Sequence, residues 1–385
     1  MINLDDAEKI RKSELESYCR KKLIDPSGDS GVQEAPPCPK CLDNDNLKII
    51  HGTMEIANQM YTMVQGLKKL GAEAKTLSYY QGYLQYKSDM SLDIYSYISE
   101  KEANREIKHL AAQIIPEYDV FHYHFGTSLT LDNSDLPLLR ELNKKVLMHH
   151  WGSDVRIYSE AVQRNPYVRV KIEDENWLKR KLERLSGLID TCIVGDYELY
   201  EYVKDYYSQV VMIPQVIDID GFDIPERKTS EKKITIVHAP TSPRIKGTKY
   251  ILQTIEELEN EYDFDFILVK NMAYEEAKKV YLNADIVIDQ MLIGSYGLVA
   301  IENMALGKPV ICWISDFMKE KYPGELPIIS ANPDNIKAIL EGVLRNKDCL
   351  EEIGKKSRKY VETYHDVNKY SQKLLDLYKA LPSQK

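Results

Sequence analysis

Residues 240–250 (PTSPRIKGTKY) have the composition of a loop that binds an anion. They follow an apolar run at 234–239 that predicts a β-strand, and a helical pattern begins near Thr248. The segment offers two hydroxyls, two cations and a glycine: Thr241, Ser242, Arg244, Lys246 and Gly247. A helix N-terminus disfavours cations, and a bound phosphate would reverse that penalty. The pattern therefore predicts a phosphate site, with a solvated basic loop as the alternative.

A second segment, residues 294–311 (GSYGLVAIENMALGKPVI), places a carboxylate among apolar residues. A helix that begins at Gly297 puts Glu302 on its apolar face. The residues three and four positions from this glutamate are all apolar: Leu298, Val299, Ala305 and Leu306. A buried carboxylate is costly without a hydrogen-bond donor, and vicinal ribose hydroxyls are good donors. The alternatives are a protein cation as partner, or a side chain turned to water.

Composition and charge exclude several classes of protein. The chain has 385 residues, 43% hydrophobic and 29% charged, which is typical of a globular protein with two domains. The net charge of −9 argues against a general nucleic-acid-binding protein. We find no secretory signal and no apolar run of about 18 residues, so we expect a cytoplasmic protein without a membrane-spanning helix. Cys38 and Cys41 could form half of a zinc site, but two free thiols in a loop are favoured because no second pair follows.

Short apolar runs alternate with helical patterns from residue 47 onward, which predicts an α/β fold with doubly wound parallel sheets. The predicted strands are 47–50, 119–125, 145–150, 190–194, 234–239, 264–269, 285–289, 309–314 and 326–329. A polar stretch at 212–232 contains two prolines and marks a domain boundary. Two such domains would face each other across a central cleft, where ligands bind at the carboxyl ends of the strands.

Four parts are therefore expected along the chain. Residues 1–46 would be an extension, flexible or partly helical. Residues 47–215 would form the N-terminal Rossmann-like domain on the acceptor side, and residues 216–365 the C-terminal domain that binds a nucleotide sugar. Residues 366–385 would form a helix that could pack back on the N-terminal domain.

The chain resembles the retaining GT-B glycosyltransferases of family 4. That family carries an arginine and a lysine after the first strand of its C-terminal domain, then Glu-Ser-Phe-Gly-Leu-x-x-x-Glu-x-Met-Ala-x-Gly-x-Pro-Val. Here the second stretch reads GSYGLVAIENMALGKPV at 294–310. The first half supports the likeness with HGTMEIANQMYTMVQGLKKLG, DVFHYHFG and HHWGSDVR. The resemblance covers about 47–365 and implies the GT-B architecture.

The resemblance also implies roles for the C-terminal residues. Lys246 and Arg244 would clamp the diphosphate of a nucleotide-sugar donor, and Glu302 would bind its ribose. The neighbouring loops would complete the donor site with two hydroxyls and three amides: Thr241, Ser242, Ser295, Tyr296 and Gly297. The implied mechanism is electrostatic stabilisation of the leaving diphosphate without a metal or another cofactor.

On the acceptor and sugar side, the resemblance implies residues of the N-terminal domain. Gly52 would lie in the first βα turn and face the transferred group. His149 or His150, with Gly152 and Asp154, would line the sugar side of the cleft. The acceptor would be a carbohydrate, a lipid-linked molecule or a small molecule. Basic residues at 177–186 could allow peripheral membrane contact.

The chain departs from the family pattern in two places. Gly294 replaces the first glutamate, which contacts the donor sugar in the family. Thr241 stands where the family's arginine usually lies, and Arg244 is two positions before the lysine. These departures leave two alternatives open: an inactive GT-B scaffold subunit, and a nucleotide-sugar epimerase, which the motif order disfavours.

One histidine pair could bind a metal. His122 and His124 would share one face of a strand, a spacing that can bind zinc. No cysteine or carboxylate stands beside them at ligand spacing, so we expect no metal there.

Overall fold

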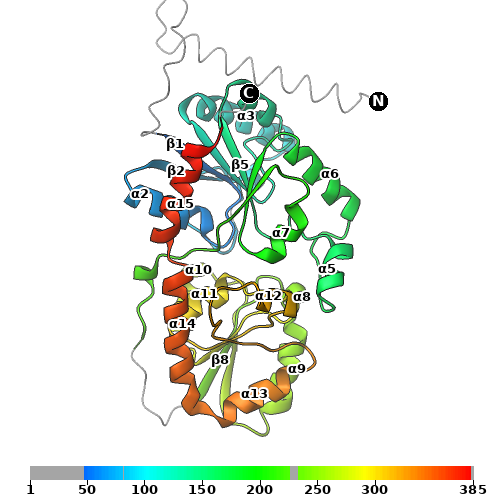
Figure 1. Ribbon diagram of the computed structural model, residues 1–385, viewed down its shortest axis with the longest axis vertical. Coiled ribbons are helices and arrows are strands. Elements are labelled where there is room, and N and C mark those ends of the chain that lie inside the picture. The colour runs from blue at the N-terminus through cyan, green and yellow to red at the C-terminus, as the bar shows by residue number, and fades with distance from the viewer. Residues whose placement is uncertain (1–46, 81, 226–232, 383–385) are drawn as a thin grey trace, which may run out of the picture.

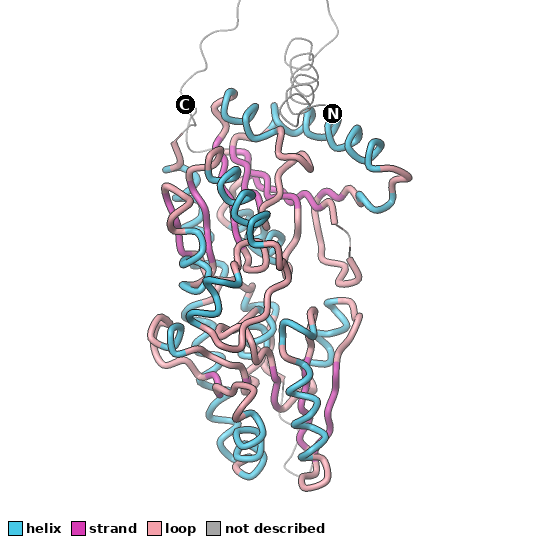
Figure 2. Tube along the Cα trace, turned by 90° about the vertical axis from the view of Figure 1, so that its right-hand side faces the viewer, coloured by secondary structure: helices cyan, strands magenta, loops and turns pink. Residues whose placement is uncertain are grey.

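The computed structural model describes three stretches of the chain: residues 47–80, 82–225 and 233–382. They form two α/β domains (Figure 1). In the side view of Figure 2 the domains lie one above the other, each with its strands between helices. The predicted extension at 1–46, with Cys38 and Cys41, lies outside the described residues. Among the helices of the three stretches, none is both long and apolar enough to cross a membrane.

The N-terminal domain is built on a seven-stranded parallel sheet with the order β3-β2-β1-β4-β5-β6-β7. Its strands are β1 (Lys48–Thr53), β2 (Glu73–Ser78), β3 (Met90–Ser91), β4 (Val120–His124), β5 (Lys145–His150), β6 (Thr191–Val194) and β7 (Gln209–Met212). Its α-helices are α2 (Gln59–Lys69), α3 (Glu100–Glu117), α4 (Asp135–Glu141), α5 (Tyr158–Arg164), α6 (Glu175–Ser186) and α7 (Tyr197–Val203). Every residue of β4, β5 and β6 is buried, as expected for central strands covered by helices on both faces.

The C-terminal domain has a five-stranded parallel sheet with the order β12-β11-β10-β8-β9. Its strands are β8 (Ile234–His238), β9 (Phe264–Leu268), β10 (Ile286–Ile288), β11 (Val310–Ile311) and β12 (Ile328–Ile329). Its α-helices are α8 (Pro243–Lys246), α9 (Thr248–Leu258), α10 (Tyr274–Leu282), α11 (Leu298–Ala305), α12 (Asp316–Lys319), α13 (Ile336–Arg345) and α14 (Leu350–Tyr364). The strand order switches direction between β8 and β10, and in the N-terminal sheet between β1 and β4. Loops that follow strands at such switch points form ligand-binding crevices.

The chain crosses between the domains twice, and the two crossings are hydrogen-bonded to each other. The N–H of Ile217 donates to the carbonyl of His365, and the N–H of Val367 donates back to the carbonyl of Ile217, each at 2.9 Å. From there α15 (Val367–Ala380) packs on α2 of the N-terminal domain (Figure 1). A Cβ at Gly66 would lie 2.1 Å from a side chain of α15, so glycine permits this close approach.

The predicted fold class, two Rossmann-like doubly wound domains, is confirmed. Every strand predicted from an apolar run is present; the strand at 145–150 has the predicted ends, and the others have shifted ends. Apolar runs do not predict β2, β3 and β7, because β3 has only two residues and β2 and β7 carry exposed polar residues. The four-residue helix α8, which precedes the helix predicted near Thr248, was also not predicted.

The contact between α15 and the N-terminal sheet yields a stability prediction. The hydroxyl of buried Tyr378 lies 2.8 Å from Nε2 of His51 and 2.6 Å from Nδ1 of His122. We expect Tyr378→Phe to lower the free energy of unfolding by about 1–3 kcal/mol, because two buried imidazoles lose their partner. Urea unfolding measures this change. Tyr370→Phe, at a half-buried position of the same helix, is the control, and an equal effect of both variants would contradict the assignment.

Candidate functional site

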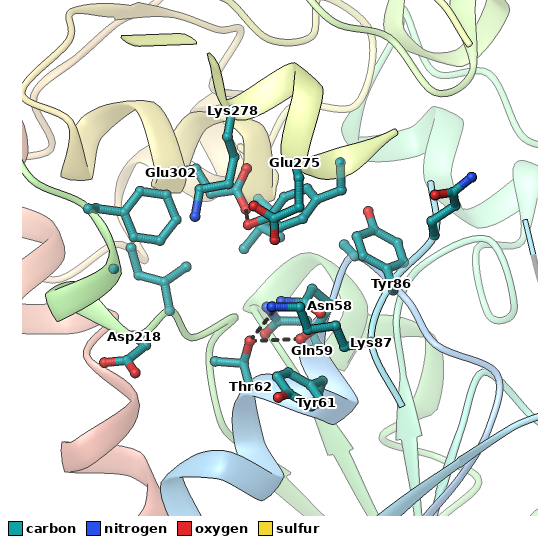
Figure 3. Close-up of a pocket in the computed structure, with 17 residues that line it drawn as sticks. Asn58, Gln59, Tyr61, Thr62, Tyr86, Lys87, Asp218, Glu275, Lys278 and Glu302 are labelled. Atoms are coloured by element: carbon teal, nitrogen blue, oxygen red, sulfur yellow. Dashed lines mark hydrogen bonds between the residues drawn. The ribbon is translucent and has the colours of Figure 1, made fainter. Parts of the chain in front are cut away.

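A pocket of about 120 Å³ lies between the domains, where α2 faces α10 and α11 (Figure 3). Polar side chains enter it from both domains: Asn58, Thr62, Tyr86, Lys87, Glu275, Lys278 and Glu302. The pocket continues along the first turn of α11, since Leu298 also lines it. It therefore lies beside the switch point of the C-terminal sheet.

Glu302 is the buried acid of this pocket, with 2% of the residue exposed. Its Oε1 accepts a hydrogen bond from the hydroxyl of Tyr274 at 2.5 Å. Burial raises the pKa of Glu302 to about 7, while the Tyr274 hydroxyl and the positive charge of Lys278 oppose the rise. The buried position agrees with the helical spacing, but the partner is a tyrosine, which the sequence analysis did not consider. Tyr274 also ties the domains together, because its N–H donates to the carbonyl of Leu84 at 3.0 Å.

Lys246 lies at the end of α8 and is bound to a buried carboxylate that the sequence analysis missed. Its Nζ donates to Oδ1 of Asp289 at 2.7 Å. The N–H of Gly297, at the start of α11, donates to Oδ2 of the same carboxylate at 2.9 Å. Two expectations are corrected here. The lysine ends a short helix instead of beginning α9, and the Gly297 amide is engaged by Asp289.

Arg244 does not stand beside Lys246 as a second clamp. Its guanidinium donates to the carbonyl of Val170 at 2.7 Å and to Glu173 at 3.2 Å, so it ties α8 to a loop of the N-terminal domain. Lys171, in the same loop, is close enough to Lys246 for the two positive charges to interact. Partial burial and the positive charges of Lys246 and Arg156 lower the pKa of Lys171. Nothing in its sequence context marks Lys171 as a site residue.

The two hydroxyls before α8 make no capping contact. Ser242 occupies the N-cap position of α8 without a side-chain hydrogen bond to the helix, and Thr241 is exposed. Both lie in the loop between β8 and α8.

The loop at 294–297 is held tightly within the protein. Gly294 has a φ of +84°, and a Cβ there would lie 2.9 Å from Cβ of Ser315, so a glutamate does not fit this backbone. Burial raises the pKa of Asp196 to about 6. A hydrogen bond from the hydroxyl of buried Ser295 opposes this rise. Tyr296 stacks on Tyr322, and its hydroxyl lies 3.0 Å from Nε2 of His365 at the interdomain crossing.

The N-terminal residues expected on the sugar side are buried in the domain. His149 and His150 each have 0% exposure, so neither presents a ring to the cleft. His150 lies between Oδ2 of Asp154, at 2.7 Å, and the hydroxyl of Tyr207, at 2.8 Å. Asp154 also accepts from two N–H groups of its own loop, at 2.9 and 3.0 Å, and therefore shapes this loop.

Both glycines predicted on this side also have local structural roles. Gly52 lies within β1 and not in the turn that follows it, so its predicted position is corrected. Gly152 has a φ of +129°, and a Cβ there would lie 3.1 Å from Nη2 of Arg156. This glycine leaves room for the guanidinium, which binds both carboxylate oxygens of Glu198 at 2.7 Å.

A buried cluster joins His51, His122 and His124, whose ring nitrogens lie within 4.8 Å of one another. Its hydrogen bonds have a fixed direction, because the indole N–H of Trp151 can only donate, and it donates to Nδ1 of His124 at 3.1 Å. Nε2 of His124 must then carry the proton, and it donates to Nδ1 of His51 at 3.1 Å. The hydrogen bonds continue from His51 through the hydroxyl of Tyr378 to His122. The rings thus form a neutral hydrogen-bonded chain, and His124 has no free lone pair on Nε2 for a metal ion.

Burial of Glu302 makes the stability of the protein depend on pH. Its pKa rises from 4.5 to about 7 on folding, so the folded state binds more protons than the unfolded state between these values. Stability from this group is therefore complete below about pH 4.5 and is lost as the pH rises through about 7. We expect Glu302→Gln to reduce this pH-dependent loss of stability by about 3 kcal/mol. Urea unfolding across this range checks it, with exposed Glu276→Gln as control; parallel curves for Glu302→Gln and the unaltered protein would refute it.

No protein-family model matches the sequence. Among curated proteins, reticulocyte-binding protein 1 of Plasmodium vivax (strain Belem) is 24% identical over 295 residues. The alignment covers 70% of this chain and 10% of that protein, so the chain spans about a tenth of the relative's length.

Solved structures resemble the chain over most of its length. Sucrose-phosphate synthase from Thermosynechococcus elongatus has a TM-score of 0.60 at 14% identity, covering 87% of this chain and 99% of that one. HepE from Anabaena in complex with UDP and glucose has a TM-score of 0.59 at 11% identity, covering 87% and 100%. A Listeria monocytogenes protein described as a UDP-N-acetylglucosamine 2-epimerase has a TM-score of 0.53 at 14% identity, covering 87% and 96%. These likenesses confirm the predicted GT-B fold.

Proposed function

We propose that the protein is a glycosyltransferase that moves a sugar from a nucleotide-diphosphate sugar to an acceptor hydroxyl, with retention of the anomeric configuration. The placement of Lys246 beside the start of α11, and of Glu302 further along this helix, carries the proposal. Lys246 lies beside the start of α11, since a Cβ at Gly297 would be 3.4 Å from its Nζ. Glu302 lies five residues after Gly297, which corresponds to about 7.5 Å along the helix axis. A nucleoside diphosphate can bridge this distance.

In this proposal Glu302 binds the ribose and Lys246 binds the diphosphate. A carboxylate can accept hydrogen bonds from both vicinal hydroxyls of a ribose. The pocket beside Glu302 would then hold the nucleoside, and Lys171 would add positive charge on the diphosphate side. The fold likeness to HepE, which was solved with UDP, supports a nucleotide donor.

Lys246 would act on the leaving group. The bond between the anomeric carbon and the diphosphate oxygen breaks, and the acceptor oxygen bonds to the same carbon on the same face. The acceptor proton passes to the departing diphosphate, and the lysine stabilises the negative charge that develops there. The lysine supplies the positive charge that a divalent cation provides in metal-dependent enzymes, so we propose a metal-independent reaction.

Two other functions fit parts of the structure. A nucleotide-sugar epimerase is favoured by the likeness to the Listeria protein and by Asp196, whose pKa of about 6 suits proton transfer beside the donor loop. It would change the donor sugar without any acceptor. A scaffold subunit is favoured by Gly294, and calorimetric titration would then detect no binding of UDP, GDP or ADP.

The acceptor is the less defined substrate. The acceptor in this proposal is a carbohydrate, a lipid-linked molecule or a small molecule. A cytoplasmic location and peripheral membrane contact through the basic residues of α6 remain predictions.

We expect Lys246→Ala to lower turnover on the order of a hundredfold, because the leaving diphosphate loses its cation. Release of nucleoside diphosphate from a panel of nucleotide sugars, in the presence of mixed acceptors, measures this change. Lys249→Ala, an exposed lysine of α9, is the matched control and should keep full turnover. Undiminished turnover of the Lys246 variant would exclude the proposed role.

A further inference from the structure

Asp289 is a buried carboxylate directly after β10, at the switch point of the C-terminal sheet. Only 1% of its side chain is exposed. One oxygen accepts from Nζ of Lys246 and the other from the N–H of Gly297.

The bonds of Asp289 join the two loops that would form the diphosphate site. The loop after β8 leads to Lys246, and the loop after β10 leads to Gly297. A backbone bond adds to this link, because the N–H of Met291 donates to the carbonyl of Lys246 at 2.9 Å. The ammonium group is thereby fixed relative to the start of α11.

Two glycines in the loop after β10, Gly294 and Gly297, lie where a larger side chain would be crowded. A Cβ at Gly297 would lie 3.4 Å from Nζ of Lys246 and 3.5 Å from Oδ2 of Asp289, so glycine leaves room for the ion pair at the helix start. Gly294 supplies no carboxylate, and its backbone leaves no room for one. Asp289 is the one acidic residue in the sequence 289–297.

We propose that Asp289 is a positioning residue that holds Lys246 in place for the leaving diphosphate, an inference that rests on the proposed function. A lysine has a flexible four-carbon stem and three N–H donors. Asp289 engages one donor and leaves two for phosphate oxygens. The side chain of Lys246 is therefore ordered before the nucleotide sugar binds, and binding does not have to pay for this ordering in conformational entropy.

The opposite role for Asp289 would be competition, in which the carboxylate occupies the lysine and repels the diphosphate. The two roles predict opposite effects of Asp289→Asn, which removes the charge and keeps the shape. Positioning predicts that the variant binds UDP roughly tenfold more weakly, because the charge-assisted bond to Lys246 is lost. Competition predicts tighter binding.

Calorimetric titration with UDP, and with GDP and ADP in parallel, tests the proposal on the full chain. Four proteins are compared: the unaltered protein, Asp289→Asn, Lys246→Ala and the double variant. We expect Asp289→Asn to weaken nucleotide binding when Lys246 is present and to cause no further weakening in the Lys246→Ala background. Asp263→Asn, in an exposed ion pair of the same domain, is the control and should leave the Kd unchanged.

Each outcome separates this inference from the proposed function. Unchanged or tighter binding by Asp289→Asn overturns the inference alone, and so does equal weakening in both backgrounds, which would indicate general damage to the loop. An unaltered protein that binds none of the three nucleotides, or an unaffected Lys246→Ala variant, overturns the proposed function and this inference together. Urea unfolding of all four proteins confirms that each variant is folded.

Discussion

A single buried carboxylate joins the two halves of the candidate donor site. Asp289 accepts hydrogen bonds from the side chain of Lys246 and from the backbone of Gly297, and these residues lie in the loops after β8 and β10. Parallel strands bring those loops to the same edge of the sheet, but strand order alone leaves them free to move independently. The carboxylate holds the lysine, which ends α8, beside the start of α11, and Glu302 lies further along α11. The geometry of the proposed donor site therefore depends on this ion pair.

The contact between the domains adds a second constraint on the same loop. The side-chain amide of Asn165 donates to the carbonyls of Leu292 and Ile293, each at 2.8 Å. Arg244 donates across the domains to the carbonyl of Val170. The N-terminal domain thus holds the loop after β10 from one side, while the interdomain crossing at 217 and 365–367 links the domains elsewhere. Opening the cleft would break these bonds, which ties domain motion to the shape of the donor site.

The sequence predicted most of the strands, the fold class and the buried position of Glu302, because apolar runs and helical spacing are local signals. It failed where tertiary contacts decide. Asp289 lies at the end of a predicted strand, and its ion pair depends on a residue 43 positions away. His149 or His150 was expected to line the cleft, yet both are buried, because His149 stacks on Trp151 and His150 lies between Asp154 and Tyr207. Lys171 lies in a loop without a ligand-binding motif, so only the fold brings it near Lys246.

A crystal structure of the protein with a bound nucleoside diphosphate tests the account most directly. We expect phosphate oxygens within hydrogen-bond distance of Nζ of Lys246, ribose hydroxyls on the carboxylate of Glu302, and Asp289 still bound to the lysine. A nucleotide bound away from α11, or one that displaces Asp289 from Lys246, would contradict it.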